Sequence, residues 1–98
     1  MKRGKILKRA LKTINGQRQD SYGSPEDSFK IIGEYWTTYL KAQGVIPSEG
    51  SEVKIQPKEV AEMMVLFKVA RMSGQEFTAD NYVDGAGYIA IAADLGSK

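Results

Sequence analysis

The chain has 98 residues and a mass of 10.8 kDa, which allows one compact domain but is too small for two independent cores. Hydrophobic residues make up 42% of it and charged residues 27%, as in an ordinary folded domain. It contains no cysteine and no histidine, which excludes disulfides, thiol nucleophiles and histidine-based catalysis. Any chemistry must therefore come from carboxylates, lysine, arginine, tyrosine and hydroxyl groups.

The charges are distributed unevenly along the chain. Residues 1–18 carry seven basic side chains and no acidic one, whereas residues 19–98 carry seven basic and twelve acidic side chains. The net charge of +2 thus combines a basic amino-terminal segment with an acidic remainder. No apolar run approaches the ~18 residues that a membrane span needs, and no signal-peptide pattern follows the first residues. We expect a cytoplasmic protein without a membrane partner.

The first half of the sequence predicts two helices. Residues 1–16 place apolar side chains on one face among several lysines and arginines, and Asn15-Gly16 ends this amphipathic, basic helix. Ser24 can cap the next helix over 24–44, and Pro25 suits its first position. Its continuous apolar stripe indicates a core helix and consists of Phe29, Ile32, Trp36, Tyr39 and Leu40.

The second half predicts two more helices, over 57–73 and 79–95, which end near Gly74 and Gly96. The segment between residues 45 and 56 is compatible with a loop or with a small β-hairpin. The sequence therefore predicts a single all-α domain over residues 1–98 that resembles a four-helix bundle.

Charged side chains lie on the apolar faces of the last two predicted helices. At 100° per residue, Glu59 falls inside the apolar sector of its helix, and Glu62 falls at the edge of that sector. On the last helix, Asp80 and Asp84 lie one turn apart on the same face as Tyr88. Because a buried, unpaired carboxylate costs several kcal/mol, a cation should compensate these groups. The four carboxylates could together chelate Mg²⁺.

Simpler explanations of these four carboxylates remain open. Asp80 stands where helix caps are common, and Glu59 gains from the helix dipole near a helix start. Glu59 or Asp84 could also pair with Arg71 or Lys68 in a buried ion pair that involves no ligand.

Three blocks of sequence carry a resemblance to a known group of proteins. These blocks are Arg18-x-x-x-Tyr22-Gly23-x-Pro25, the run Val60-Ala61-x-Met63-Met64 leading to Lys68-Val69-Ala70-Arg71, and Asp80-Asn81-Tyr82-Val83-Asp84-x-x-Gly87-Tyr88. Over residues 5–95 the chain resembles a family of small phage and prophage proteins of unknown function. More distantly, it is similar to the MazG-type all-α nucleoside triphosphate pyrophosphohydrolases.

The distant resemblance implies an acidic site for Mg²⁺. In MazG-type proteins an E-x-x-E pair on one helix faces an E-x-x-D pair on the next. Glu59 and Glu62 match the first pair, as metal ligands and catalytic carboxylates. Asp80 and Asp84 would supply the second pair of metal ligands, although they are spaced four residues apart instead of three and Asp replaces Glu. The implied reaction is Mg²⁺-dependent hydrolysis of a nucleoside triphosphate with release of pyrophosphate.

The same resemblance implies side chains that contact the nucleotide. The expected phosphate ligands are Lys68, Arg71 and Arg18, and the expected nucleotide contacts are Tyr22, Asn81 and Tyr88.

Two other functions stay open. One is a non-catalytic nucleotide-binding or host-interaction module, in which Arg18, Tyr22, Lys68 and Arg71 hold an anion without a metal. The other is direct contact between the basic first helix and nucleic acid, since a row of lysines and arginines attracts phosphates. Apolar residues also occur on the outer sides of the last two predicted helices, so we expect a homo-oligomer.

Overall fold

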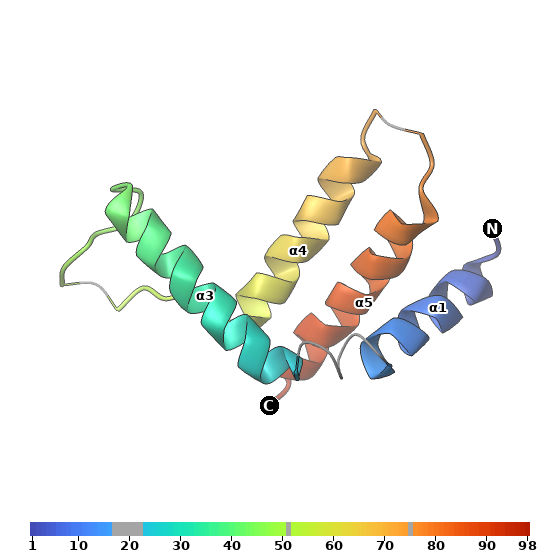
Figure 1. The fold of residues 1–98 in the computed structure, drawn as a ribbon, viewed down its shortest axis with the longest axis horizontal. Helices are drawn as coiled ribbons and strands as arrows, with labels where there is room; N and C mark the ends of the chain where they lie inside the picture. The colour runs from blue at the N-terminus through green and yellow to red at the C-terminus, as the bar shows by residue number, and fades with distance from the viewer. Residues whose placement is uncertain (17–22, 51, 75) are drawn as a thin grey trace.

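The computed structural model describes residues 1–16, 23–50, 52–74 and 76–98, and these residues form four α-helices (Figure 1). The helices are α1 (Arg3–Asn15), α3 (Pro25–Ala42), α4 (Pro57–Met72) and α5 (Ala79–Gly96). The all-α prediction is confirmed, and the predicted helix bounds agree with these to within two residues. The described part of the segment between α3 and α4 contains no strand, so a loop is found there and not a hairpin.

The starts of α3 and α4 are stabilised by side chains that accept hydrogen bonds from orphan backbone N–H groups. Ser24 Oγ accepts a hydrogen bond from the Asp27 backbone N–H at 3.2 Å, and Pro25 occupies the first position of α3. At the start of α4, the Gln56 backbone N–H donates to Glu59 Oε1 at 3.0 Å. Glu59 thus serves as a capping residue, which is one of the explanations that the sequence left open.

The helices are arranged around α5. Helices α4 and α5 run antiparallel side by side and form the largest helix–helix contact, and α1 lies along the other side of α5 (Figure 1). Helix α3 contacts the start of α4, and its carboxyl-terminal half points away from the other helices (Figure 1). None of the described helices is long and apolar enough to cross a bilayer.

A backbone contact joins α3 to the segment before α4. A Cβ atom built on Gly33 would lie 2.2 Å from the carbonyl oxygen of Ile55 and 3.5 Å from Val60 Cγ2. Only glycine leaves room for the chain to pass this close. The buried Thr37, one turn further along α3, holds the same segment through a hydrogen bond from the Ile55 backbone N–H.

The core is small and lies between α1, α4 and α5. Among the described residues its fully or nearly fully buried hydrophobic members are Ala10, Val60, Ala61, Val83 and Ala92. The predicted core stripe on the second helix does not belong to this core, because Tyr39 is mostly exposed and the other members, Phe29, Ile32, Trp36 and Leu40, are only partly buried. The radius of gyration is 15.1 Å, whereas a compact chain of this length has a value of about 13 Å. The four helices therefore form an open arrangement.

Candidate functional site

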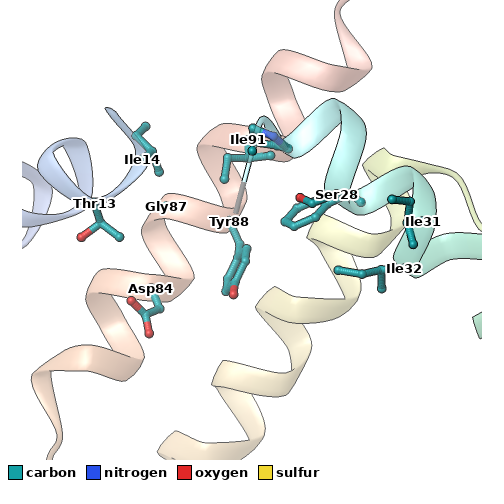
Figure 2. Close-up of a pocket in the computed structure, with 12 residues that line it drawn as sticks. Thr13, Ile14, Ser28, Ile31, Ile32, Asp84, Gly87, Tyr88 and Ile91 are labelled. Carbon is teal, nitrogen blue, oxygen red and sulfur yellow. The ribbon is translucent and has the colours of Figure 1, made fainter. Parts of the chain in front are cut away.

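An apolar pocket lies where α1, α3 and α5 approach one another (Figure 2). Its volume is about 350 Å³. The carboxyl-terminal end of α1, the first half of α3 and the middle of α5 supply its walls. The lining residues are Thr13, Ile14, Gly23, Pro25, Ser28, Phe29, Ile31, Ile32, Asp84, Gly87, Tyr88 and Ile91.

Aromatic rings form part of the pocket wall. The rings of Phe29 on α3 and Tyr88 on α5 have centroids 6.3 Å apart and are tilted by 35°. Tyr88 was a predicted nucleotide contact, and the structure places it in the pocket. Gly87 allows α1 to come close, because a Cβ atom there would lie 3.2 Å from Ile14 Cγ2. The pocket thus depends on a small residue at the α1–α5 contact.

An ion pair connects the pocket to α4. Lys68 Nζ lies 2.9 Å from Asp84 Oδ2, and the two side chains are only 14% and 16% exposed. Asp84 also lines the pocket, so its carboxylate is the main charged group on the pocket wall (Figure 2). The lysine keeps this carboxylate compensated in a largely apolar setting. The alternative in which Asp84 pairs with Lys68 is therefore confirmed.

The other three predicted metal ligands lie elsewhere, each with a contact of its own. Glu59 accepts the capping hydrogen bond from Gln56, and Glu62 pairs with Lys58 at 2.8 Å. Asp80 pairs with Arg9 of α1 at 3.0 Å, and its side chain is 70% exposed. Over the part of the chain that the structure describes, no group of three or more acidic side chains could hold a metal ion.

The expectation that the four carboxylates converge was thus wrong for this arrangement, and the reason is geometric. Glu59 and Asp80 both lie in the first turn of their helices, and antiparallel helices place their first turns at opposite ends. Sharing an apolar face fixes the direction of a side chain around the helix but not its height along the helix. Mg²⁺ binding itself stays a prediction that these contacts do not test.

The predicted phosphate and nucleotide contacts are divided between two places. Lys68 Nζ pairs with Asp84 of the pocket wall and also lies 5.8 Å from the ring centre of Phe67, and the guanidinium of Arg71 lies 5.4 Å from the same ring. Asn81 is buried and donates to the Arg71 carbonyl oxygen at 3.5 Å, which links the first turn of α5 to the last turn of α4. Asn81 therefore has a structural contact. The predictions for Arg18 and Tyr22 fall outside the described residues.

Several pocket residues were not identified from the sequence as site residues. Phe29 and Ile32 had been assigned to the core, and Thr13 and Ser28 had no assigned role. Both hydroxyls donate to a backbone carbonyl one turn earlier, to Arg9 at 2.9 Å and to Ser24 at 3.1 Å. The shared face of Tyr88 and Ile91 was visible in the sequence, but no periodicity could show which helices would meet it.

Two surface ion pairs shift pKa values near the ends of the helices. The hydrogen bond between Lys58 and Glu62 raises the pKa of Lys58 above its ordinary value. A hydrogen bond from Lys98 lowers the pKa of Glu26 below its ordinary value of 4.5. Both pairs are well exposed, and neither Glu26 nor Lys98 lines the pocket.

Comparison with known proteins gives a family but no activity. A family model described as a domain of unknown function, DUF6378, matches residues 5–96. The chain is 35% identical over 83 residues to the Gene 55 protein of Mycobacterium phage D29, which covers 85% of this chain and 48% of that protein. It is 34% identical over 86 residues to the Gene 55 protein of Mycobacterium phage L5, with 88% and 49% covered.

The chain spans about half the length of these two phage relatives. No solved structure matches it significantly. The predicted resemblance to small phage proteins of unknown function is confirmed, whereas the distant MazG likeness is not shown. By its sequence, this chain belongs to the DUF6378 family.

Proposed function

We propose that this phage-type domain binds a nucleotide, with the base in the pocket between α1, α3 and α5. The observation that carries the proposal is the position of the Lys68–Asp84 ion pair at the wall of an otherwise apolar, partly aromatic pocket. Small-molecule sites commonly combine apolar walls with a few polar groups that fix orientation.

The walls suit a planar, largely apolar ring. Tyr88 and Phe29 offer ring faces and edges, and Ile32 and Ile91 add aliphatic surface. A volume of about 350 Å³ lies within the ~300–1,000 Å³ range of small-molecule pockets. This supports a ligand about the size of a nucleoside.

The polar groups suit the rest of a nucleotide. The Asp84 carboxylate can accept hydrogen bonds from base amino groups or sugar hydroxyls. The Lys68 ammonium, 2.9 Å from that carboxylate, brings a positive charge that phosphates favour. Thr13 of α1 and Ser28 of α3 add hydroxyl groups to the lining.

Binding is favoured over hydrolysis by the placement of the carboxylates. The MazG-like mechanism needs four acidic groups around Mg²⁺, and here only Asp84 belongs to the pocket. Glu59, Glu62 and Asp80 each have a separate contact within the described residues. We therefore propose a binding module, and treat Mg²⁺-dependent pyrophosphate release as the competing outcome.

The proposal is tested by titrating nucleosides and nucleoside mono-, di- and triphosphates into the protein, with and without Mg²⁺. Calorimetry gives the affinity, and a ligand that binds only the folded state raises the melting temperature. Tyr88→Leu removes the ring but keeps an apolar side chain, so it should weaken binding by about tenfold or more, equivalent to about 1.4 kcal/mol.

A matched control is Ile89→Leu, which changes the neighbouring residue on the exposed side of α5 and should leave the affinity unchanged. If no member of the panel binds, or if both variants weaken binding equally, the pocket is not a nucleotide site. Release of pyrophosphate in the presence of Mg²⁺ would instead support an enzyme.

A further inference from the structure

Helix α3 carries an exposed apolar stripe that none of the described elements covers. Ile31, Tyr35 and Tyr39 follow one another at i, i+4 and i+8, and they are 54%, 73% and 62% exposed. By the 100° rule Lys30 lies well away from the centre of the stripe at Tyr35, whereas Glu34 lies at the edge of the stripe, next to Ile31. The stripe is therefore an apolar surface along α3, and the carboxyl-terminal half of this helix points away from the other helices (Figure 1).

The total exposed surface of the chain is larger than a free domain of this size has. It amounts to 7127 Å², whereas a folded monomer of the same mass exposes about 5,500 Å². The excess is roughly 1,600 Å² per chain, which is within the ~1,000–2,500 Å² that each subunit buries in an obligate dimer. The excess exposed area is thus similar to the area that one subunit buries at an interface.

A second uncovered surface lies on α4 next to α3. Val60 faces Gly33 of α3, and Met63 and Phe67 continue the same side of α4 at i+3 and i+7. Both of these residues are exposed, and the carboxyl-terminal half of α3 points away from α4 (Figure 1). By the 100° rule this surface lies on the Gly33 side of α3, opposite to the stripe, so it is a separate apolar surface and does not extend the stripe.

We propose that a second copy of this chain covers the α3 stripe, with the two α3 helices antiparallel about a two-fold axis near Tyr35. Such a contact pairs each patch with itself. The spacing fits this symmetry, since Ile31 and Tyr39 lie four residues on either side of Tyr35. Ile31 of one copy then lies against Tyr39 of the other, and the two Tyr35 rings meet at the axis.

This dimer has a consequence for the pocket. Ile31 belongs both to the α3 stripe and to the pocket lining. A partner helix on the stripe would therefore close the pocket beside Ile31 and shield a bound ligand from water. The pocket and the dimer contact share one helix, although each is tested separately.

Sedimentation and light scattering test the association directly. We expect twice the 10.8 kDa mass of one chain at micromolar concentrations. Tyr35→Glu places a carboxylate at the axis in both copies and should shift the protein to monomer. Lys30→Gln changes the net charge by the same one unit on another side of α3 and should leave the dimer intact. Circular dichroism checks that both variants keep their helices.

Cysteine cross-linking locates the axis independently, because the chain has no cysteine of its own. Under mild oxidation, Tyr35→Cys should form a covalent dimer rapidly, whereas Lys30→Cys should not. The proposal is overturned if the wild-type chain is a monomer at high micromolar concentration. It is equally overturned if Lys30→Cys cross-links as fast as Tyr35→Cys, or if Tyr35→Glu leaves the dimer unchanged.

Discussion

The Thr37 hydroxyl accepts a hydrogen bond from the Ile55 backbone N–H at 2.9 Å and donates one to the Gly33 carbonyl oxygen at 2.7 Å. Thr37 is buried, so water cannot replace either partner easily. The hydroxyl thus fixes the segment before α4 against α3, and with it the angle at which α3 leaves the other helices.

Thr37→Val keeps the shape of this side chain but removes the hydroxyl. The Ile55 N–H then loses its acceptor, and we expect the free energy of unfolding to fall by about 1–3 kcal/mol. Urea denaturation followed by circular dichroism measures the change. Thr37→Ser retains the hydroxyl and should lower the free energy of unfolding by clearly less. A smaller loss for Thr37→Val than for Thr37→Ser would show that the methyl group matters more than the hydrogen bond.

Two helix glycines should respond to alanine in opposite directions. In Gly33→Ala the new Cβ meets the Ile55 carbonyl oxygen at 2.2 Å, and because this neighbour is backbone the segment must move, at a cost of about 1–3 kcal/mol. In Gly85→Ala the new Cβ makes ordinary contacts at 3.8 Å with Lys68 and Met72. Because alanine has a higher helix propensity than glycine, this change should raise the free energy of unfolding by up to ~1 kcal/mol.

Thermal unfolding of the two alanine variants distinguishes these effects. The melting temperature should fall for Gly33→Ala and stay level or rise for Gly85→Ala. A stabilised Gly33→Ala would mean that α3 and the segment before α4 do not approach as closely as described.

The Lys68–Asp84 pair should contribute more to stability than the Arg9–Asp80 pair. Lys68→Met leaves the Asp84 carboxylate poorly hydrated and without its lysine. We expect the free energy of unfolding to fall by about 1–3 kcal/mol, which is somewhat less than for a fully buried pair. Asp80→Asn removes an exposed contact and should cost less than about 1 kcal/mol.

A double-mutant cycle on Lys68 and Asp84 isolates the coupling between them. Changing both residues to apolar ones, Lys68→Met with Asp84→Leu, should recover part of the stability lost in Lys68→Met. If the stability that the double variant loses relative to the wild type equals the sum of the losses of the two single variants, the two side chains do not interact in solution.

The sequence predicted the helices well because their signals are local. Ser24 and Pro25 mark the start of α3, and glycines or serines lie near each helix end, so propensity and capping suffice. The site could be predicted only in part, because it depends on which helices meet and at what height. Asp84 and Lys68 converge because the first third of α5 lies beside the last third of the antiparallel α4, whereas Glu59 and Asp80 lie at opposite ends.

The sequence of α3 also could not show that this helix would diverge from the other helices. The apolar stripe that predicted a core position for Tyr39 is present, but α4 contacts α3 only near its middle and leaves Tyr39 mostly exposed. An apolar stripe on a helix indicates that this side of the helix packs against another surface. It does not show whether that surface belongs to the same chain or to another one.

The contact between Glu26 and Lys98 joins the start of α3 to the carboxyl-terminal end of α5 and should make stability fall in acid. The Lys98 ammonium lowers the pKa of Glu26 below 4.5, so the folded protein releases this proton more readily than the unfolded chain. The resulting stabilisation is present above the ordinary pKa of the carboxyl group and is lost as the pH falls through the lower folded value. Titration of the Glu26 side chain by NMR should give a midpoint below 4.5 in the wild type. Lys98→Ala should return the midpoint toward the ordinary value, and an unchanged midpoint in that variant would mean that Lys98 does not hold the carboxylate in solution.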